Sequence, residues 1–404
     1  MRGADVVVRA LEEAGATHLF ALSGNQIMPI FDAVLGRPLQ AGLVHVRHEA
    51  AAVHAADAWG RLQHAPGVAL VTAGPGFANT LSALFVAQAA ESPMLLLSGD
   101  SPAQAPPGLF QQMDQASMAA GVTKAAWRVE RAADLGADVS RAWQLALSGR
   151  PGPVHLALPV DLLEADIDAS GEGQAPAAAA AQGTALAAAA VAEVVSLLAA
   201  AERPLVLLGP ATSRSSAEAA QRITAAAGAP WLPMESPRGV NDPSLGAVSE
   251  ILPEADLVLL LGRRLDFGLG LTAEGTLPAF GEGCRFVQID AESEELQRSA
   301  ALLGERLAVA AETADPPAAA LQLAAACEQR AGQARAGAEW GARVQHAVEL
   351  KPAAQLELGP RGEQSGIPAQ LICSALDEWL AEARTLFTFG RWWLADEQRL
   401  WLAG

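Results

Sequence analysis

The sequence predicts an α/β protein whose domains are built on doubly wound parallel sheets. Short apolar runs of strand length alternate with segments of helical periodicity along most of the chain. Several of these runs, such as "VALVTAGPG", lead directly into glycine-containing turns, as strands do before the helix of a βαβ unit. The longest strongly apolar run, "ADLVLLLG", has the length of a strand and is far too short to span a bilayer.

The length, net charge and cysteine spacing of the chain indicate which binding partners and which cell compartment to expect. The chain has 404 residues, enough for two or three domains, and a formal net charge of −18. Such a charge argues against nucleic acid and membrane surfaces, because both select a basic surface. Charged residues interrupt the first twenty positions, which is not typical of a signal peptide. The cysteines follow no metal or disulfide spacing, so we expect a cytoplasmic protein (Cys284, Cys327 and Cys373).

The first domain is expected over residues 1–167. Residues 3–15 place Val7 and Leu11 on one helical face and predict a helix. Beyond it, strand and helix patterns alternate: strands are predicted over 17–24, 42–49, 67–76, 93–100 and 153–161, and helices over 27–35, 50–62 and 77–91. Alternation of this kind favours a parallel sheet, and ligands of such sheets bind beyond the carboxyl ends of the strands.

The remaining chain predicts a second α/β domain between two linkers. Residues 168–190 are rich in Ala, Gly and Pro and are expected to form a linker. The central domain is expected over 191–335, with strands in "RPLVLLGPA", "APWLPM", "ADLVLLLGRRLDF" and "CRFVQIDAE". A second linker is expected over 336–364. Residues 365–404 resemble the start of a third domain that is too short to bury its own core.

The stretch "RHEAAAVHAADAWGR", residues 47–61, leaves two roles open for Glu49. Zinc binding is excluded by spacing, because a helical pair of ligands needs histidines at i and i+4 whereas His54 lies six residues after His48. A carboxylate in the first helical turn could simply complement the helix dipole. Alternatively, Glu49 points into the crevice at the end of a strand, where burial would raise its pKa and favour proton transfer.

Several motifs, in order, resemble the large subunit of acetolactate synthase and related thiamine diphosphate enzymes. They are "GAD…LEEAGATHLFALSGN", "VRHEAAAVHAADAWGR", "VALVTAGPGFANTLSAL", "ESPMLLLSGD", "FQQMD", "RPGPVHLALPVDL", "ADLVLLLGRRLDFGLG" and "FVQIDAESEEL". The relatives include oxalyl-CoA decarboxylase, 2-hydroxyacyl-CoA lyase and benzoylformate decarboxylase. The resemblance implies a pyrimidine-binding first domain, a scaffolding central domain and a third domain that binds diphosphate and Mg²⁺. It also implies a homodimer or homotetramer whose sites form between subunits.

The resemblance assigns the catalytic role to Glu49. In the family this glutamate bonds to N1′ of the aminopyrimidine and shares a proton with it, which lets the cofactor lose its C2 proton. The other cofactor-binding residues that the resemblance implies are Gly24, Asn25, Thr72, Gly74, Pro75, Gly76 and Asn79. The "TAGPG" turn departs from the family at Ala73, where serine is usual. Phe110, Gln111 and Lys124 match residues of the substrate channel.

Other family features are missing from the sequence. The diphosphate signature is Gly-Asp-Gly followed by an asparagine, which supplies oxygen ligands to Mg²⁺. No Gly-Asp-Gly occurs, and the asparagines are Asn25, Asn79 and Asn241, so we expect no metal ligands in this chain. FAD is not expected, because the Gly-Met-His-Gly stretch of flavin-type relatives is missing. Arg263 and Arg264 could meet a nucleotide phosphate or serve a structural role.

These features predict an enzyme that decarboxylates a 2-oxo acid such as pyruvate and joins the product to a second one. A non-flavin decarboxylase or 2-hydroxyacyl-CoA lyase is the alternative. The missing metal ligands have three possible explanations. The chain is a fragment of a longer enzyme, a truncated non-catalytic relative, or a chain that another polypeptide completes. The 404 residues alone are expected to be inactive.

Overall fold

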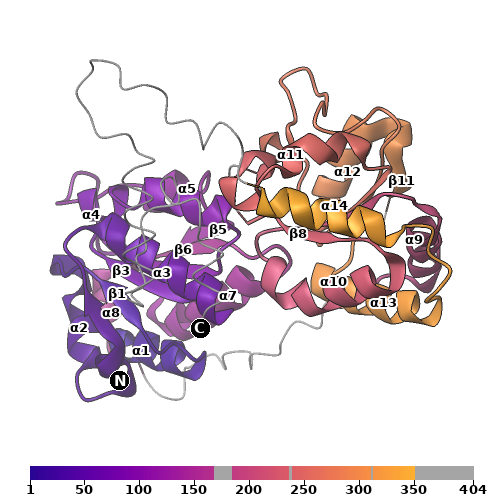
Figure 1. The fold of residues 1–404 in the computed structure, drawn as a ribbon. Helices are drawn as coiled ribbons and strands as arrows, with labels where there is room; N and C mark the ends of the chain where they lie inside the picture. Colours follow the sequence, from indigo (N-terminus) through magenta and orange to yellow (C-terminus); the bar gives the residue numbers. More distant parts are fainter. Residues whose placement is uncertain (168–183, 236–238, 311–312, 351–404) are drawn as a thin grey trace, which may run out of the picture. The chain divides into compact units, whose positions relative to one another are not determined.

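The computed structural model describes residues 1–167, 184–235, 239–310 and 313–350 (Figure 1). The chain divides into two compact units, Met1–Gly183 and Thr184–Gly404, and each contains one parallel sheet. The predicted α/β class with doubly wound parallel sheets is confirmed.

The sheet of the first unit has six strands in the order β2-β1-β3-β4-β6-β5. All neighbouring strands pair in parallel. The winding reverses between β1 and β3, where a ligand crevice forms in sheets of this type. The strands are β1 (Leu19–Ala21), β2 (Leu43–His45), β3 (Gly67–Val71), β4 (Met94–Asp100), β5 (Ala125–Arg128) and β6 (Pro153–Pro159).

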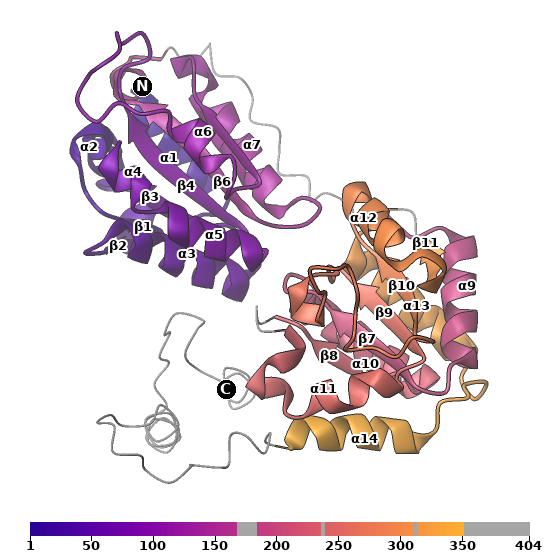
Figure 2. The ribbon, with the colours of Figure 1, turned by 90° about the horizontal axis from the view of Figure 1, so that it is seen from above.

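Helices cover both faces of this sheet, as the view from above shows (Figure 2). One face packs against α1 (Gly3–Glu13), α2 (Met28–Val34), α7 (Leu135–Leu147) and α8 (Val160–Glu164). The other packs against α3 (Glu49–Gln63), α4 (Pro75–Ala78), α5 (Leu81–Ala89) and α6 (Gln115–Ala119). The ends of the unit meet: Arg2 forms an antiparallel bridge with Asp166, and the Gly3 amide donates to the Ala165 carbonyl at 2.9 Å.

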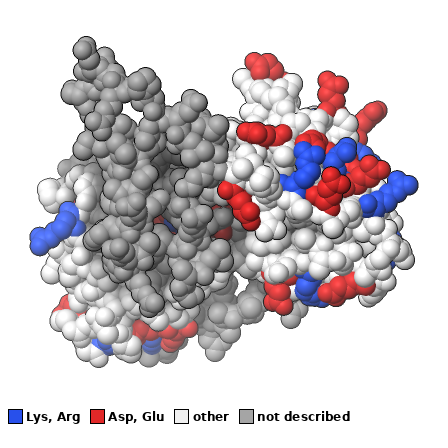
Figure 3. Space-filling view, in the orientation of Figure 1, with Lys and Arg blue, Asp and Glu red and all other residues white. Residues whose placement is uncertain are grey.

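The second unit has a five-stranded sheet in the order β11-β10-β9-β7-β8, also parallel, with its reversal between β7 and β9. Its strands are β7 (Pro204–Leu208), β8 (Trp231–Pro233), β9 (Leu257–Leu261), β10 (Arg285–Ile289) and β11 (Leu307–Ala310). Its helices are α9 (Ala188–Ala200), α10 (Ser213–Ala227), α11 (Val248–Ile251), α12 (Ser293–Leu303), α13 (Pro316–Gln329) and α14 (Ala338–Glu349). Acidic and basic side chains lie interleaved on one described face of this unit (Figure 3).

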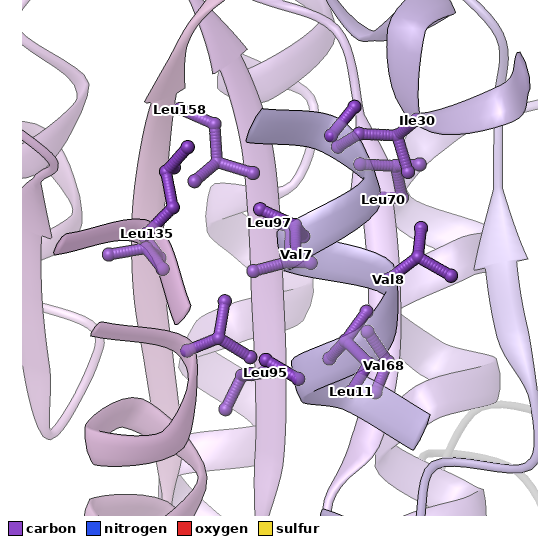
Figure 4. Packing of buried hydrophobic residues seen from close by; sticks show 14 of the residues in the cluster. Val7, Val8, Leu11, Ile30, Val68, Leu70, Leu95, Leu97, Leu135 and Leu158 are labelled. Atoms are coloured by element: carbon purple, nitrogen blue, oxygen red, sulfur yellow. The ribbon is translucent and has the colours of Figure 1, made fainter. Parts of the chain in front are cut away.

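Helices cover both faces of each sheet, so the strands are mostly apolar and form the centres of the cores. In the first unit, α1 lays Val7 and Leu11 against Val68 of β3 and Leu95 and Leu97 of β4 (Figure 4). Every residue of β3, β4 and β6 is buried. The buried strands fix the positions at which the loops leave the carboxyl edge.

Three local expectations differ from the structure. The predicted helix over 77–91 is broken into α4 and α5 by Asn79 and Thr80, and Thr80 donates its hydroxyl to the Phe77 carbonyl. The described part of the expected linker over 336–364 contains a packed helix, α14, whose Trp340 is buried and donates to the Pro204 carbonyl at 2.8 Å, and residues 351–364 lie outside the described residues. Strands β5 and β11 have no counterpart among the predicted elements.

Most of the first expected linker and the expected third domain, 365–404, lie outside the described residues. Among the described residues, no helix combines the length and the apolar character needed to cross a bilayer.

Candidate functional site

The loops after β1 and β3 meet at the point where the first sheet reverses its winding. A Cβ added to Gly24 would lie 2.3 Å from Cβ of Thr72, so only glycine allows the two loops to approach this closely. Asn25 and Pro75 are exposed and lie next to this contact in sequence. The cofactor-binding residues predicted after both strands therefore share one edge of the sheet.

Glu49 enters this site from the start of α3. His48 is the helix cap, and its Nδ1 accepts a hydrogen bond from the Ala50 amide at 3.1 Å. Glu49 is half-buried, and its Oε2 accepts a hydrogen bond from Asn79 Nδ2 at 3.0 Å. The capping role thus belongs to His48, while the carboxylate of Glu49 contacts the loop after β3.

The two glycines of the "TAGPG" turn are closely packed beside this carboxylate. A Cβ on Gly76 would lie 3.3 Å from Glu49 Oε1 and 2.7 Å from Cγ2 of Thr72. Gly74 has a φ of +63°, in the region that favours glycine. A side chain at either position would clash with Gln111 or Thr72, so the close packing of the turn requires glycine at both.

Gln26 belongs to the site and was missed in the sequence. Its Oε1 accepts a hydrogen bond from Thr72 Oγ1 at 2.6 Å, and its side chain is buried. The only signal for it was its position directly after "SGN". This bond joins the loops after β1 and β3 across the reversal of the sheet.

The loop over residues 101–114 brings the predicted substrate residues to the same edge. Phe110 is 73% exposed. Gln111 has a φ of +59°, which is uncommon for a residue with a side chain. A Cβ on Gly74 would lie 2.8 Å from Cβ of Gln111, so Gln111 packs directly on the glycine turn.

Lys124 is not brought together with these residues. It precedes β5, at the amino edge of the sheet, opposite to the carboxyl edge that holds Glu49. Its Nζ donates to the carbonyl of Arg150 at 3.0 Å and to the carbonyl of Ser148. Sequence order alone could not reveal which edge this lysine occupies.

A buried histidine lies beneath the glycine turn. The ring of His155, on β6, is 4.7 Å from the ring of Phe77, and its Nε2 shares a hydrogen bond with Ser98 Oγ at 2.8 Å. Complete burial lowers the pKa of His155 to about 3, because a charged imidazole would lose its solvation. His155 is therefore neutral at physiological pH and supports the turn from below.

Two protein-family models, both of thiamine pyrophosphate enzymes, match this chain. The model described as "Thiamine pyrophosphate enzyme, N-terminal TPP binding domain" matches residues 1–118, which include the whole Glu49 and glycine-turn site. The model described as "Thiamine pyrophosphate enzyme, central domain" matches residues 191–312.

The chain belongs to the thiamine pyrophosphate enzymes.

Similar proteins within this family carry out several reactions. Oxalyl-CoA decarboxylase of Escherichia coli is 33% identical over 314 residues, which is 73% of this chain and 53% of that protein. An acetolactate synthase large subunit of Mycobacterium tuberculosis is 33% identical over 281 residues, 67% of this chain and 50% of its own length. The 2-hydroxyacyl-CoA lyase 2 of Caenorhabditis elegans is 42% identical over 162 residues, 40% of this chain and 25% of that protein. The chain spans about half the length of the first two relatives.

The two arginines after β9 are each paired with carboxylates. Both terminal nitrogens of Arg263 donate to Asp266, at 2.8 and 2.9 Å. Burial alone would raise the pKa of Asp266, but the hydrogen bonds and charge of Arg263 outweigh burial and lower this pKa. Arg264 lies 3.5 Å from Glu292 and 3.8 Å from Glu295. These ion pairs give both arginines a structural role next to β9.

The described residues contain no group of three or more His, Cys, Asp or Glu side chains arranged to hold a metal ion.

Proposed function

We propose that the first unit binds the aminopyrimidine part of thiamine diphosphate over the glycine turn, with Glu49 as the catalytic residue. The observation that carries this proposal is the placement of Glu49 Oε1, 3.3 Å from the position that a Cβ on Gly76 would take. A ring held over the two glycines would have this oxygen within reach of its edge.

The surrounding residues have complementary roles in this proposal. Asn79 donates to Glu49 Oε2 and thereby fixes the carboxylate with its other oxygen toward the turn. Thr72 and Gln26 hold the two loops together beneath the ring. The bound cofactor supplies a carbanion nucleophile, and Glu49 contributes by holding and exchanging a proton at the ring nitrogen.

For the whole reaction, we propose decarboxylation of a 2-oxo acid such as pyruvate, followed by carboligation to a second 2-oxo acid. Similarity to acetolactate synthases supports this assignment. We further propose that the diphosphate and its Mg²⁺ are held by residues other than those described, and that the protein works as a homodimer or homotetramer.

A second candidate is a decarboxylase or lyase that acts on an acyl-CoA substrate. The observation in its favour is the 42% identity with 2-hydroxyacyl-CoA lyase 2, together with similarity to oxalyl-CoA decarboxylase. Incubation with pyruvate, oxalyl-CoA or a 2-hydroxyacyl-CoA in the presence of cofactor and Mg²⁺, with product analysis, would separate the two candidates.

The role of Glu49 is tested by Glu49→Gln and hydrogen–deuterium exchange at C2 of thiamine diphosphate. Calorimetric titration first establishes how much cofactor is bound, so that exchange is compared per occupied site. An amide keeps the size of the side chain but cannot exchange a proton at neutral pH, so we expect exchange to slow by about 10²–10⁴-fold. Glu13→Gln, at the 62% exposed last residue of α1, is the matched control and should leave exchange unchanged.

Two results would contradict the proposal. Exchange that is equally fast with Glu49→Gln and wild type would remove the catalytic assignment. Exchange no faster with the wild-type chain than in buffer, at measured occupancy, would show that Glu49 does not activate the cofactor within these 404 residues, the result expected of a fragment as well as of a non-catalytic relative.

A further inference from the structure

The loop over residues 101–114 must be held in place for Gln111 to cover the glycine turn. The loop leaves the carboxyl end of β4 and returns at α6. Its return is fixed by the side chain of Gln115, which donates to the Gly99 carbonyl at 2.9 Å. Gln111 lies toward the end of the loop, in a left-handed conformation that the surrounding contacts must maintain.

Arg128 holds the start of this loop. It is the last residue of β5 and reaches across β6 to Asp100 at the end of β4. Its Nε donates to Asp100 Oδ2 at 2.6 Å. Its terminal nitrogens donate to the carbonyls of Ser101, Pro102 and Ala103 at 2.8, 3.1 and 3.2 Å.

These four acceptors are consecutive in sequence, so one guanidinium sets the direction in which the loop departs. Asp100 is only 3% exposed, and its Oδ1 also accepts a hydrogen bond from the Ser101 amide at 2.7 Å. Arginine suits this position because its planar group donates in several fixed directions, whereas lysine has a single ammonium.

We propose that Arg128 is a positioning residue, which fixes the loop over residues 101–114 so that Gln111 packs on Gly74 and closes one side of the cofactor turn. This inference rests on the proposed function only where it concerns the cofactor. Arg128 acts through the loop and lies in no motif that the sequence analysis assigned to the site.

The test uses chymotrypsin, which cuts after large apolar residues, on the native chain without cofactor. Leu109 and Phe110 are 42% and 73% exposed and lie next to Gln111. Arg128→Ala should speed cleavage after these two residues by at least about tenfold, the change expected when one charge-assisted hydrogen bond is lost. Arg128→Lys should remain closer to Ala than to wild type, because an ammonium cannot reproduce the four contacts.

Arg131→Ala is the matched control, since this arginine is 72% exposed and lies 3.5 Å from Asp134. Equal cleavage in Arg128→Ala and the control would overturn the proposal. Full rescue by lysine would also overturn it, because charge alone would then suffice. An equal rise in cleavage at all sites would make Arg128 a general stabiliser. If Arg128→Ala does not fold, Arg128→Lys carries the comparison.

Adding thiamine diphosphate separates this inference from the proposed function. Cofactor should slow cleavage after Phe110 in wild type but not in Arg128→Ala. Equal protection of both proteins would refute the positioning role. If cofactor protects neither protein while the cofactor-free difference persists, the proposed function fails and the anchoring of the loop by Arg128 stands.

Discussion

Acid should destabilise the first unit through His155. This histidine is fully buried, and its pKa in the folded protein is about 3, against about 6.5 in an unfolded chain. Between these values the unfolded state binds a proton that the folded state does not bind. The free energy of unfolding therefore falls as pH drops below about 6.5, by about 1.4 kcal/mol per pH unit.

At pH 5 the predicted loss is about 2 kcal/mol, since pH 5 lies about 1.5 units below the unfolded pKa. Urea unfolding of wild type and His155→Leu, at pH 7.5 and pH 5, measures it. Other groups contribute equally to both proteins, so wild type should lose about 2 kcal/mol more than the variant. His54→Gln removes an exposed histidine and should behave like wild type.

If wild type and His155→Leu lose equal free energy of unfolding between pH 7.5 and pH 5, this reasoning is refuted. Burial of His155 would then not lower its pKa. Unfolding of the first unit at low pH should also disorder the glycine turn, since the His155 ring packs against Phe77 directly after that turn.

Three further predictions concern the two units. Glu91→Gln should lower the free energy of unfolding by about 3–5 kcal/mol, because it removes the carboxylate charge that Arg150 meets inside the protein, whereas Glu13→Gln should cost less than about 1 kcal/mol; urea unfolding measures both. Trp340→Ala should cost about 3–5 kcal/mol in the second unit, by the same assay, and a negligible change would show that α14 is not part of its core. Phe85 is 62% exposed on α5, so we expect α5 to lie in the dimer interface. Phe85→Asp should then convert a dimer to a monomer in sedimentation at micromolar concentration, and a wild-type protein that is already monomeric would refute this interface.

The sequence predicted most strands because their residues are buried on both sides. Strands β3, β4 and β6 are mostly apolar and buried along their whole length, and a short run of this kind that begins at or just after a glycine or proline has few alternatives. Strand β5 escaped prediction because all four of its residues are half-buried and two of them are Trp127 and Arg128. Helix α14 escaped it because polar residues separate the few apolar positions that it buries.

The candidate site was predictable where a motif follows a strand, and unpredictable where a long-range contact decides. The glycines after β1 and β3 gave a clear signal, and the parallel sheet brings both loops to one edge. The hydrogen bond between Glu49 and Asn79 joins residues 30 positions apart, and no local pattern encodes it. Lys124 illustrates the same limit, because its residue type gives no indication of the edge of the sheet on which it lies.

The bridge between Arg2 and Asp166 has a consequence for synthesis on the ribosome. The Gly3 amide meets the Ala165 carbonyl, so the first helix can complete its docking only after the last residues of the unit have left the exit tunnel. At about 5–20 residues per second, this delay is on the order of ten seconds or more. Until β3 and β4 have also emerged, the apolar face of α1 stays exposed, and we expect chaperones that recognise nascent apolar segments to bind there.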